Sequence, residues 1–159
     1  MRIVKRRRLE NKTDYRLRLE LLKSQTPRIV IRKTNKYIYA QVVESHEAID
    51  SVKNAVSSRE LLKEGWDKKF AGSLKSIPAC YLTGLLLARE AGKGKFIIDI
   101  GMARNISGGR IYALVKGLVE GGLDINAGDV MPSKERIEGE HLKPEVKMII
   151  KKVQEKLKK

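Results

Sequence analysis

The first 36 residues limit how this 159-residue chain can fold more than any other part of it. They carry thirteen Lys and Arg side chains against three Asp and Glu, which accounts for ten of the net +15 charge. So many unpaired charges cannot be buried in an apolar core, and a surface this basic favours a polyanion as its partner. However, Leu17, Leu21 and Leu22 recur at helical spacing, which is not typical of a disordered tail. We therefore predict a structured arm that binds nucleic acid.

The remaining charge is also unevenly divided. Residues 37–142 hold fourteen basic and fourteen acidic side chains, whereas residues 143–159 hold seven basic and two acidic ones. A neutral globule with two basic ends predicts segments that follow a phosphate backbone. The single Cys80 excludes an internal disulfide and a cysteine zinc cluster, and no stretch has the length of a membrane span. We expect a protein of a reducing compartment, the cytoplasm, with no membrane partner.

A β-hairpin is the strongest strand signal in the chain. Two runs, Arg28 to Thr34 and Tyr37 to Glu44, flank a two-residue turn at Asn35-Lys36, which would pair Arg32 with Tyr39. The predicted core face consists of Ile29, Ile31, Ile38, Ala40 and Val42. The predicted exposed face consists of Arg28, Val30, Arg32, Thr34, Tyr37, Tyr39 and Gln41. Its guanidinium and phenol groups suit RNA, and a solvated face with two half-buried tyrosines is the alternative.

The rest of the pattern predicts the α/β class: a mixed β-sheet with that antiparallel hairpin in its N-terminal half, covered by helices. The further predicted elements are a helix capped by Thr13 or Asp14 and ending near Lys23, a strand over Ala48 to Val56, a short helix from Ser57 or Ser58 to Glu64, a buried helix over Ile77 to Ala91, a central parallel strand over Phe96 to Gly101, a helix over Arg110 to Glu120, one or two helical turns in Pro132 to Glu138, and a helix from Pro144. The loop from Met102 to Gly109 carries no element. The Asn126 to Gly128 stretch opens an irregular region.

The expected domain organisation follows the charge. We expect a basic RNA-binding arm with a short helix over residues 1–27, an α/β globular body over 28–125, an irregular segment with short helical turns over 126–142, and a basic amphipathic helix over 143–159. The apolar stripe of this last helix is expected to dock on the body, and a partner protein is the alternative. Cys80 lies in the buried helix and is expected to be a small core residue.

Catalytic chemistry finds little support in the sequence. The loop from Gly101 to Arg110 joins a strand to a helix, the usual place for a bound phosphate, but it does not match G-x-G-x-x-G. Gly92-Lys93-Gly94-Lys95 precedes a strand and lacks the Walker spacing. Asp99, Asp124 and Asp129 are candidate metal ligands, but the hairpin strands contribute no Asp, and Asp124 and Asp129 lie in glycine-bounded loops where forming a turn is their ordinary role. We therefore expect no metal, no cofactor and no enzymatic activity. A phosphate-handling or nucleotide-binding enzyme using this loop is the runner-up, and an RNA phosphate held by Arg104, Asn105, Ser107 and Arg110 is the other use of it.

Several short sequence motifs occur in a specific order along the chain. They are Arg6-Arg7-Arg8, Lys12-Thr13-Asp14-Tyr15, Leu21-Leu22-Lys23-Ser24, Arg32-Lys33-Thr34-Asn35-Lys36, Gly65-Trp66, Tyr81-Leu82-Thr83-Gly84-Leu85, Asp99-Ile100-Gly101, Lys116-Gly117 and Gly122-Leu123-Asp124. This series resembles large-subunit ribosomal protein eighteen in its archaeal and eukaryotic form, the 5S rRNA-binding family. Eukaryotic relatives have longer extensions, which favours the archaeal type. The resemblance implies a mixed α/β body that places arm and hairpin against 5S rRNA in the central protuberance, beside 23S rRNA and a second 5S-binding protein.

The leading hypothesis is therefore a structural RNA-binding protein that attaches 5S rRNA to the large ribosomal subunit. The predicted RNA-binding residues are Arg6, Arg7, Arg8, Lys12, Thr13, Tyr15, Arg16, Arg18, Lys23, Arg28, Arg32, Lys33, Thr34, Asn35, Lys36, Tyr37, Tyr39, Arg104 and Arg110. A third reading makes Arg6-Arg7-Arg8 a targeting signal or a solvated tail. Alanine substitutions there would then leave RNA affinity unchanged.

Overall fold

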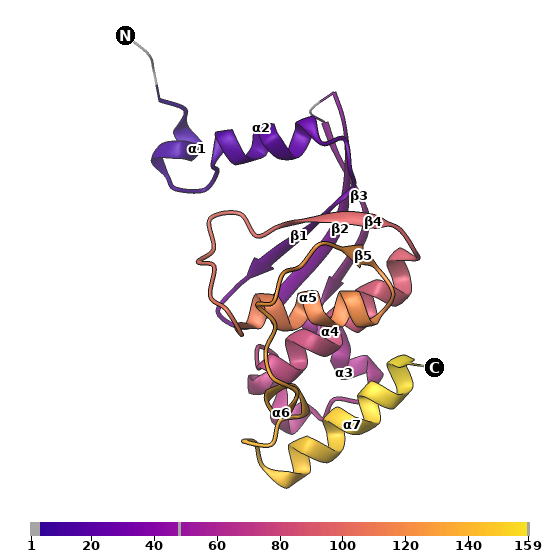
Figure 1. Ribbon diagram of the computed structural model, residues 1–159. Helices are drawn as coiled ribbons and strands as arrows, with labels where there is room; N and C mark the ends of the chain where they lie inside the picture. Colours follow the sequence, from indigo (N-terminus) through magenta and orange to yellow (C-terminus); the bar gives the residue numbers. More distant parts are fainter. Residues whose placement is uncertain (1–3, 48, 159) are drawn as a thin grey trace.

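A computed structural model of the protein describes residues 4–47 and 49–158 (Figure 1). Its elements in chain order are α1 (Arg6–Leu9), α2 (Tyr15–Lys23), β1 (Arg28–Lys33), β2 (Ile38–His46), β3 (Ile49–Ser57), η1 (Ser58–Glu60), α3 (Leu61–Glu64), η2 (Lys68–Ser73), α4 (Ile77–Ala91), β4 (Lys95–Asp99), α5 (Arg110–Glu120), β5 (Asp124–Ile125), α6 (Lys134–Glu138) and α7 (Pro144–Lys158). None of the helices in these ranges is long and apolar enough to cross a membrane.

The strands form one mixed sheet in the order β3-β2-β1-β4-β5. β1 and β2 pair in the predicted register, with Arg32 opposite Tyr39, and the Thr34 N–H closes the turn by donating to the Tyr37 carbonyl at 2.9 Å. β3 is antiparallel to β2, β4 is parallel to β1, and β5 is parallel to β4. The predicted α/β class with its N-terminal hairpin is confirmed.

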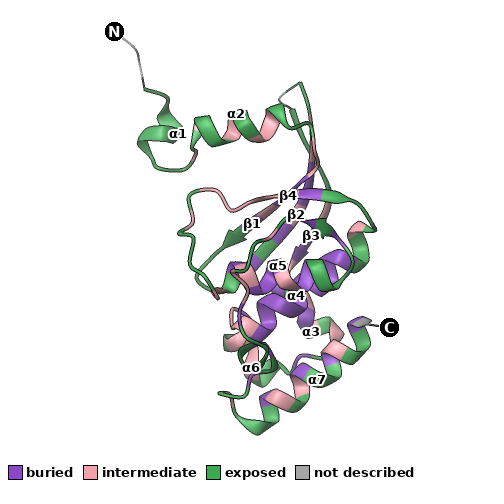
Figure 2. Cartoon of the chain, viewed as in Figure 1, coloured by how far each residue is buried: buried purple, intermediate pink, exposed green. Residues whose placement is uncertain are grey.

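One face of the sheet packs on helices, and the other leaves several of its polar residues accessible to solvent. Ile29, Ile31, Ile38 and Ala40 are completely buried on the helix-covered side, as the alternation predicts. The opposite face leaves Tyr39 40% exposed. Figure 2 shows buried residues in α4 and α5, with buried and exposed segments mixed along the strands. The open face is therefore available to a partner.

The helices begin where the sequence places capping residues. The Asp14 carboxylate accepts hydrogen bonds from the N–H groups of Arg16 and Leu17 at 2.9 and 3.3 Å, which starts α2. Ser57 and Glu60 form a reciprocal capping box that leads into α3. The predicted helices over residues 15–23, 77–91 and 110–120 are confirmed.

Two glycines set the distance between α4 and α5. A Cβ atom on Gly84 would lie 2.2 Å from the Leu114 carbonyl oxygen, and one on Gly117 would lie 2.2 Å from the Tyr81 carbonyl oxygen. The backbones of the two helices are therefore in direct contact. This contact makes α4 and α5 one rigid layer under the sheet.

The last helix, α7, covers the side of α4 that faces away from the sheet (Figure 1). Its stripe of Val146, Ile150, Val153 and Leu157 is at most 6% exposed, so the expected docking on the body is confirmed. Glu64 fixes the contact, because its carboxylate accepts Arg89 at 3.0 Å and Lys156 at 2.8 Å.

The structure also differs from the sequence-based expectations. α1, η2 and the two-residue strand β5 were not predicted, and the region around Asp124 is a strand where a turn was expected. β4 spans Lys95–Asp99, one residue earlier at its start and two shorter at its end than predicted. β3 extends to Ser57, and its predicted first residue, Ala48, lies outside the described residues.

Candidate nucleic-acid interface

The N-terminal arm, defined here as α1, α2 and the residues joining them, projects from the body (Figure 1). α2 buries no residue, and neither does α1. The arm is organised by its own polar contacts: the Arg7 Nε donates to Thr13 Oγ1 at 2.9 Å, and the Lys5 ammonium lies 4.4 Å from the centre of the Tyr15 ring. The arm is therefore built to present its side chains outward.

Glu10 is the internal counter-charge of the arm. Its carboxylate accepts hydrogen bonds from Arg6 and Lys12, each at 2.7 Å. These hydrogen bonds lower the pKa of Glu10 below its usual value. The pairs lie at the surface and remain accessible to solvent, so they orient the side chains without adding much stability.

A chain of ion pairs joins the arm to the sheet. The Asp50 carboxylate on β3 forms ion pairs with Arg18 of α2 at 3.1 Å and with Arg28 of β1 at 2.7 Å. It also accepts a hydrogen bond from the Ser45 hydroxyl at 2.8 Å. Partial burial would raise the pKa of Asp50, but the hydrogen bonds from Ser45 and Arg18 and the nearby Arg28 charge outweigh it and lower the pKa. We call Arg18, Asp50 and Arg28 the arm latch.

The prediction that Arg28 lies on the exposed face of the hairpin is wrong. Arg28 is 4% exposed, because it lies between Asp50 on β3 and Asp99 on β4, whose carboxylate is 3.9 Å from its Nε. Strand alternation places Arg28 on the open face, but two carboxylates from other strands enclose it. Arg28 is therefore not free to bind phosphate in this conformation, and it holds Asp50 in place for Arg18.

Replacing Asp50 with asparagine should release the arm latch. The Asp50→Asn variant leaves the buried Arg28 charge with only the more distant Asp99, so we expect the free energy of unfolding to fall by about 1–3 kcal/mol. Amide hydrogen exchange over residues 15–23 should accelerate together with it. Denaturant titration and exchange measurements check both effects, with Asp129→Asn as the control, since Asp129 is exposed and forms no ion pair with a described residue. Equal behaviour of the two variants would contradict the latch.

The difference in the free energy of unfolding between wild type and Asp50→Asn should depend on pH in a defined direction. The pKa of Asp50 is lowered on folding, so its stabilising contribution is complete above the unfolded carboxyl pKa of about 4 and disappears as the pH falls through the folded value. Wild type and Asp50→Asn should therefore differ most near neutral pH and converge in acid.

A groove of about 140 Å³ lies between the arm and the sheet. Arg7, Lys12 and Arg18 line it from the arm, and Arg32 lines it from β1. Asp99 accepts the Arg32 guanidinium at 3.2 Å and the Gly101 N–H at 2.8 Å, which orients Arg32 at the groove. The groove can take a polyanionic strand, because its cations outnumber its carboxylates.

The predicted site residues fall into three classes of exposure. The exposed ones are Arg6, Arg7, Arg8, Lys12, Arg16, Lys23, Arg32, Lys33, Thr34, Asn35, Lys36, Tyr39, Arg104 and Arg110. The half-buried ones are Thr13, Tyr15, Arg18 and Tyr37, and Tyr37 packs partly against the core. Only Arg28 among them is buried.

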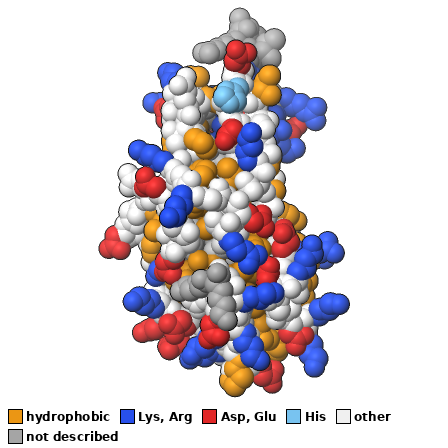
Figure 3. Space-filling view, turned by 90° about the vertical axis from the view of Figure 1, so that its right-hand side faces the viewer, with side chains coloured by type: hydrophobic (Ala, Val, Ile, Leu, Met, Phe, Trp, Pro, Cys, Tyr) orange, Lys and Arg blue, Asp and Glu red, His pale blue; other side chains and the backbone are white. Residues whose placement is uncertain are grey.

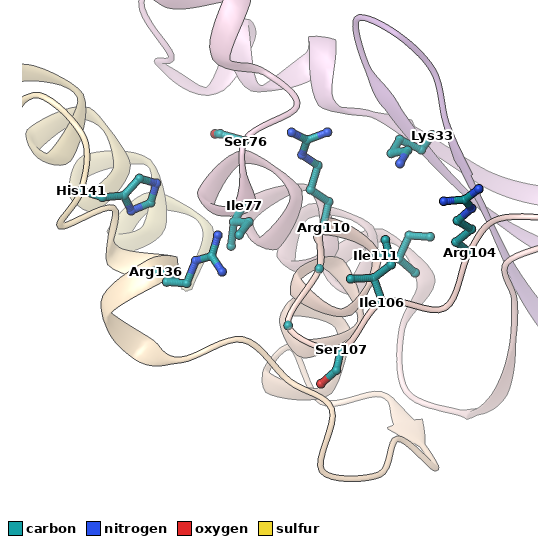
Figure 4. Close-up of a pocket in the computed structure, with 12 residues that line it drawn as sticks. Lys33, Ser76, Ile77, Arg104, Ile106, Ser107, Arg110, Ile111, Arg136 and His141 are labelled. Carbon is teal, nitrogen blue, oxygen red and sulfur yellow. The ribbon is translucent and has the colours of Figure 1, made fainter.

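The structure brings some of these residues together in two places. Part of the arm and Arg32 line the groove, whereas Lys33, Arg104 and Arg110 line a second pocket together with Arg136 and His141 (Figure 4). The predicted residues from Thr34 to Tyr39 line neither of them. Asn105, an expected phosphate contact, instead accepts a hydrogen bond from the Tyr112 hydroxyl. The sequence gives no signal for Arg136 and His141, because they follow the loop by many residues and reach it only through the fold.

The basic C-terminal helix does not form a uniform cationic surface. Lys156 pairs with Glu64 at 2.8 Å, and Lys147 lies 3.9 Å from Glu140. On the face shown in Figure 3, basic and acidic side chains are mixed over the lower part of the molecule. Two lysines of this helix are therefore compensated by carboxylates.

The described residues offer little catalytic chemistry. Cys80 is completely buried, and burial raises the pKa of its thiol to about 12, so it is a core residue as predicted. Within residues 4–47 and 49–158, no three His, Cys, Asp or Glu side chains gather as metal ligands would.

Comparison with known proteins connects this cationic surface to a family. A family model described as "Ribosomal large subunit proteins 60S L5, and 50S L18" matches residues 1–96. The large ribosomal subunit protein uL18 of Methanoculleus marisnigri is 46% identical over 141 residues, covering 86% of this chain and 78% of its own. The chain belongs to the uL18 family of large-subunit ribosomal proteins.

Other uL18 proteins support the same assignment. The uL18 of Korarchaeum cryptofilum is 43% identical and covers 86% of this chain and 70% of its own, and that of Ignicoccus hospitalis is 41% identical and covers 89% and 69%. The predicted resemblance to the archaeal form is confirmed. The uL18 family is a family of structural proteins, so the expectation that the chain is not an enzyme is also confirmed.

Proposed function

We propose that this protein is a structural constituent of the large ribosomal subunit that binds 5S rRNA and attaches it to 23S rRNA in the central protuberance. It works there in the cytoplasmic ribosome beside a neighbouring 5S-binding ribosomal protein. The observation that carries the proposal is the arm: a projecting pair of helices that buries none of its residues and exposes Arg6, Arg7, Arg8, Lys12 and Arg16. A surface of this kind has little use without a polyanion.

The chemistry of the exposed groups assigns their roles. The guanidinium and ammonium groups neutralise phosphates, and most contacts are to the backbone, because paired RNA exposes little sequence in its deep major groove. The phosphate-binding residues of this surface are Arg6, Arg7, Arg8, Lys12, Arg16, Arg18, Lys23, Arg32 and Lys36. The aromatic rings of Tyr15, Tyr37 and Tyr39 stack or hydrogen-bond at riboses and unpaired bases, while Thr13, Thr34 and Asn35 offer hydrogen bonds to 2′-hydroxyls or bases.

A gel-shift titration with 5S rRNA, in the presence of a tRNA competitor, tests the proposal. The triple variant Arg6→Gln, Arg7→Gln, Arg8→Gln should bind 5S rRNA at least about tenfold more weakly at 0.15 M salt, because phosphate contacts are lost. The control is Lys68→Gln, Lys69→Gln, Lys93→Gln, which removes the same charge from exposed positions outside the arm.

Two results would reject the proposal. If the arm triple and the control lose the same affinity, the arm is a solvated tail or a targeting signal. If wild type binds 5S rRNA no better than tRNA, the ligand is a different polyanion.

A further inference from the structure

A second pocket, of about 420 Å³, lies away from the arm at the end of the hairpin. Four separate parts of the chain enclose it: the end of β1, the start of α4, the loop that leads into α5, and the segment from α6 to α7. Figure 4 shows the labelled side chains approaching from these parts, with Arg110 extending between Ser76 and Lys33 in this view. The pocket therefore exists only in the folded protein.

The lining of this pocket is cationic. Lys33, Arg104, Arg110 and Arg136 contribute to it, His141 adds an imidazole, and no Asp or Glu belongs to it. Within the part of the chain that the structure describes, none of the four basic groups forms an ion pair with a carboxylate. A phosphate would therefore meet uncompensated charge on several sides.

The arm differs in this respect. Arg6 and Lys12 share Glu10, Arg16 lies 3.5 Å from Glu20, and Arg18 is held by Asp50. An RNA phosphate that binds these groups must compete with a carboxylate. The cations of the pocket face no such competition from a carboxylate, so more of their charge is available to each bound phosphate.

The backbone at the pocket adds donors to the cations. Gly108 and Gly109 line it directly before α5, whose N-cap residue Gly109 supplies no side-chain cap. The first N–H groups of the helix are thus left for another acceptor, and the positive end of the helix dipole favours an anion there. This supports the cation cluster and does not stand alone.

The last two residues of β1, Arg32 and Lys33, each contribute a cation to a different site. Side chains of consecutive strand residues point to opposite faces of a sheet, so Arg32 reaches the groove beside the arm while Lys33 reaches the pocket on the helix side. The two sites therefore lie on opposite sides of the strand and take separate phosphates.

We propose that the pocket of Lys33, Arg104, Arg110, Arg136 and His141 is a second phosphate-binding site for RNA that acts independently of the arm. It rests on the proposed RNA-binding function and extends it, because it gives the segment after α5 an RNA contact through Arg136 and His141. The ligand is the phosphodiester of an RNA strand. A free nucleotide or inorganic phosphate shares this chemistry and must be distinguished by experiment.

The test is fluorescence anisotropy with labelled 5S rRNA at several salt concentrations. Four full-length proteins are compared: wild type, the arm triple, the lysine control triple described above, and a pocket triple of Arg104→Gln, Arg110→Gln and Arg136→Gln. Losing one phosphate contact should weaken binding about fivefold at 0.15 M salt and reduce the slope of log K against log salt by about 0.7–0.9 relative to the control. The three arginines are exposed and form no ion pair with a described residue, so the fold should be unchanged.

A second measurement uses the wild-type sequence of the pocket. Acetylation of Lys33 by a small amine-reactive reagent should be slowed when RNA is bound, relative to Lys68, and this protection should persist in the arm triple at saturating RNA. If Lys33 stays unprotected, or if the pocket triple matches the control, the pocket site is rejected while the arm proposal stands.

Titration with ATP and with inorganic phosphate distinguishes the sources of the ligand. If wild type binds either tightly, and the pocket triple loses that binding but keeps its full affinity for RNA, the pocket holds a free phosphate compound and the inference is overturned. Failure of wild type to bind 5S rRNA specifically would overturn both proposals, which the first titration reveals.

Discussion

Binding of this protein to 5S rRNA should weaken about 10³- to 10⁵-fold when the salt concentration rises from 50 to 200 mM. The estimate assumes that about six to ten phosphates are neutralised and uses duplex DNA as a guide. The physical reason is release of condensed counterions from the RNA when Lys and Arg side chains replace them. Filter binding or anisotropy across this range measures the slope directly.

A matched comparison separates this effect from a general response to charge. Replacing chloride with glutamate, or adding a tRNA competitor, changes the baseline for every basic protein. Under the same conditions, a variant differs from wild type in the slope of log K against log salt only when it has lost phosphate contacts. A nearly flat salt response of the wild type would mean that base contacts and apolar burial carry the affinity, and the arm would then have another purpose.

Alanine at Gly84 or at Gly117 should strongly destabilise the fold. Each new Cβ would lie 2.2 Å from a backbone carbonyl oxygen of the facing helix, and a backbone cannot move aside as a side chain can. Overpacking costs about 1–3 kcal/mol or more, which exceeds the gain of about 1 kcal/mol that alanine brings to a helix interior. We expect a net loss of about 1–2 kcal/mol and a fall in Tm of about 2–8 °C.

The control for these variants is Gly72→Ala. No atom lies within 4 Å of a Cβ built there, and Gly72 does not have a positive φ, so its Tm should change little. The Gly84→Ala, Gly117→Ala double variant should lose less than the sum of the single changes, because one separation of α4 from α5 relieves both overlaps. A variant at either position that is more stable than wild type would show that the two helices do not approach this closely.

Local signals in the sequence were sufficient for much of the fold. The hairpin could be predicted with its register, because the Asn35-Lys36 turn and the alternation of Ile29 and Ile31 are read within a few residues. The same holds for α2, whose cap at Asp14 acts on the next turn of chain. Features of this kind need no knowledge of distant residues.

The features that could not be predicted depend on contacts between distant parts of the chain. β5 has only two residues and exists because it pairs with β4, and α1 is a single turn supported by polar contacts of the arm rather than an apolar stripe. Arg28 follows the alternation of an exposed face but is buried by Asp50 and Asp99 from other strands. The candidate site divides in the same way: the arm residues could be named from charge alone, whereas Arg136 and His141 join the pocket only after folding.

The position of α7 over α4 has a consequence for synthesis of the protein. Eleven of the fifteen residues of α4 are buried, and part of that burial is supplied by the final helix of the described chain. A nascent polypeptide leaves the ribosome from its N-terminus, at about 5–20 residues per second, so several seconds pass between the appearance of α4 and that of α7. During this interval the apolar surface of α4 is exposed next to the highly basic N-terminal segment. A nascent chain in this state is a typical substrate of chaperones.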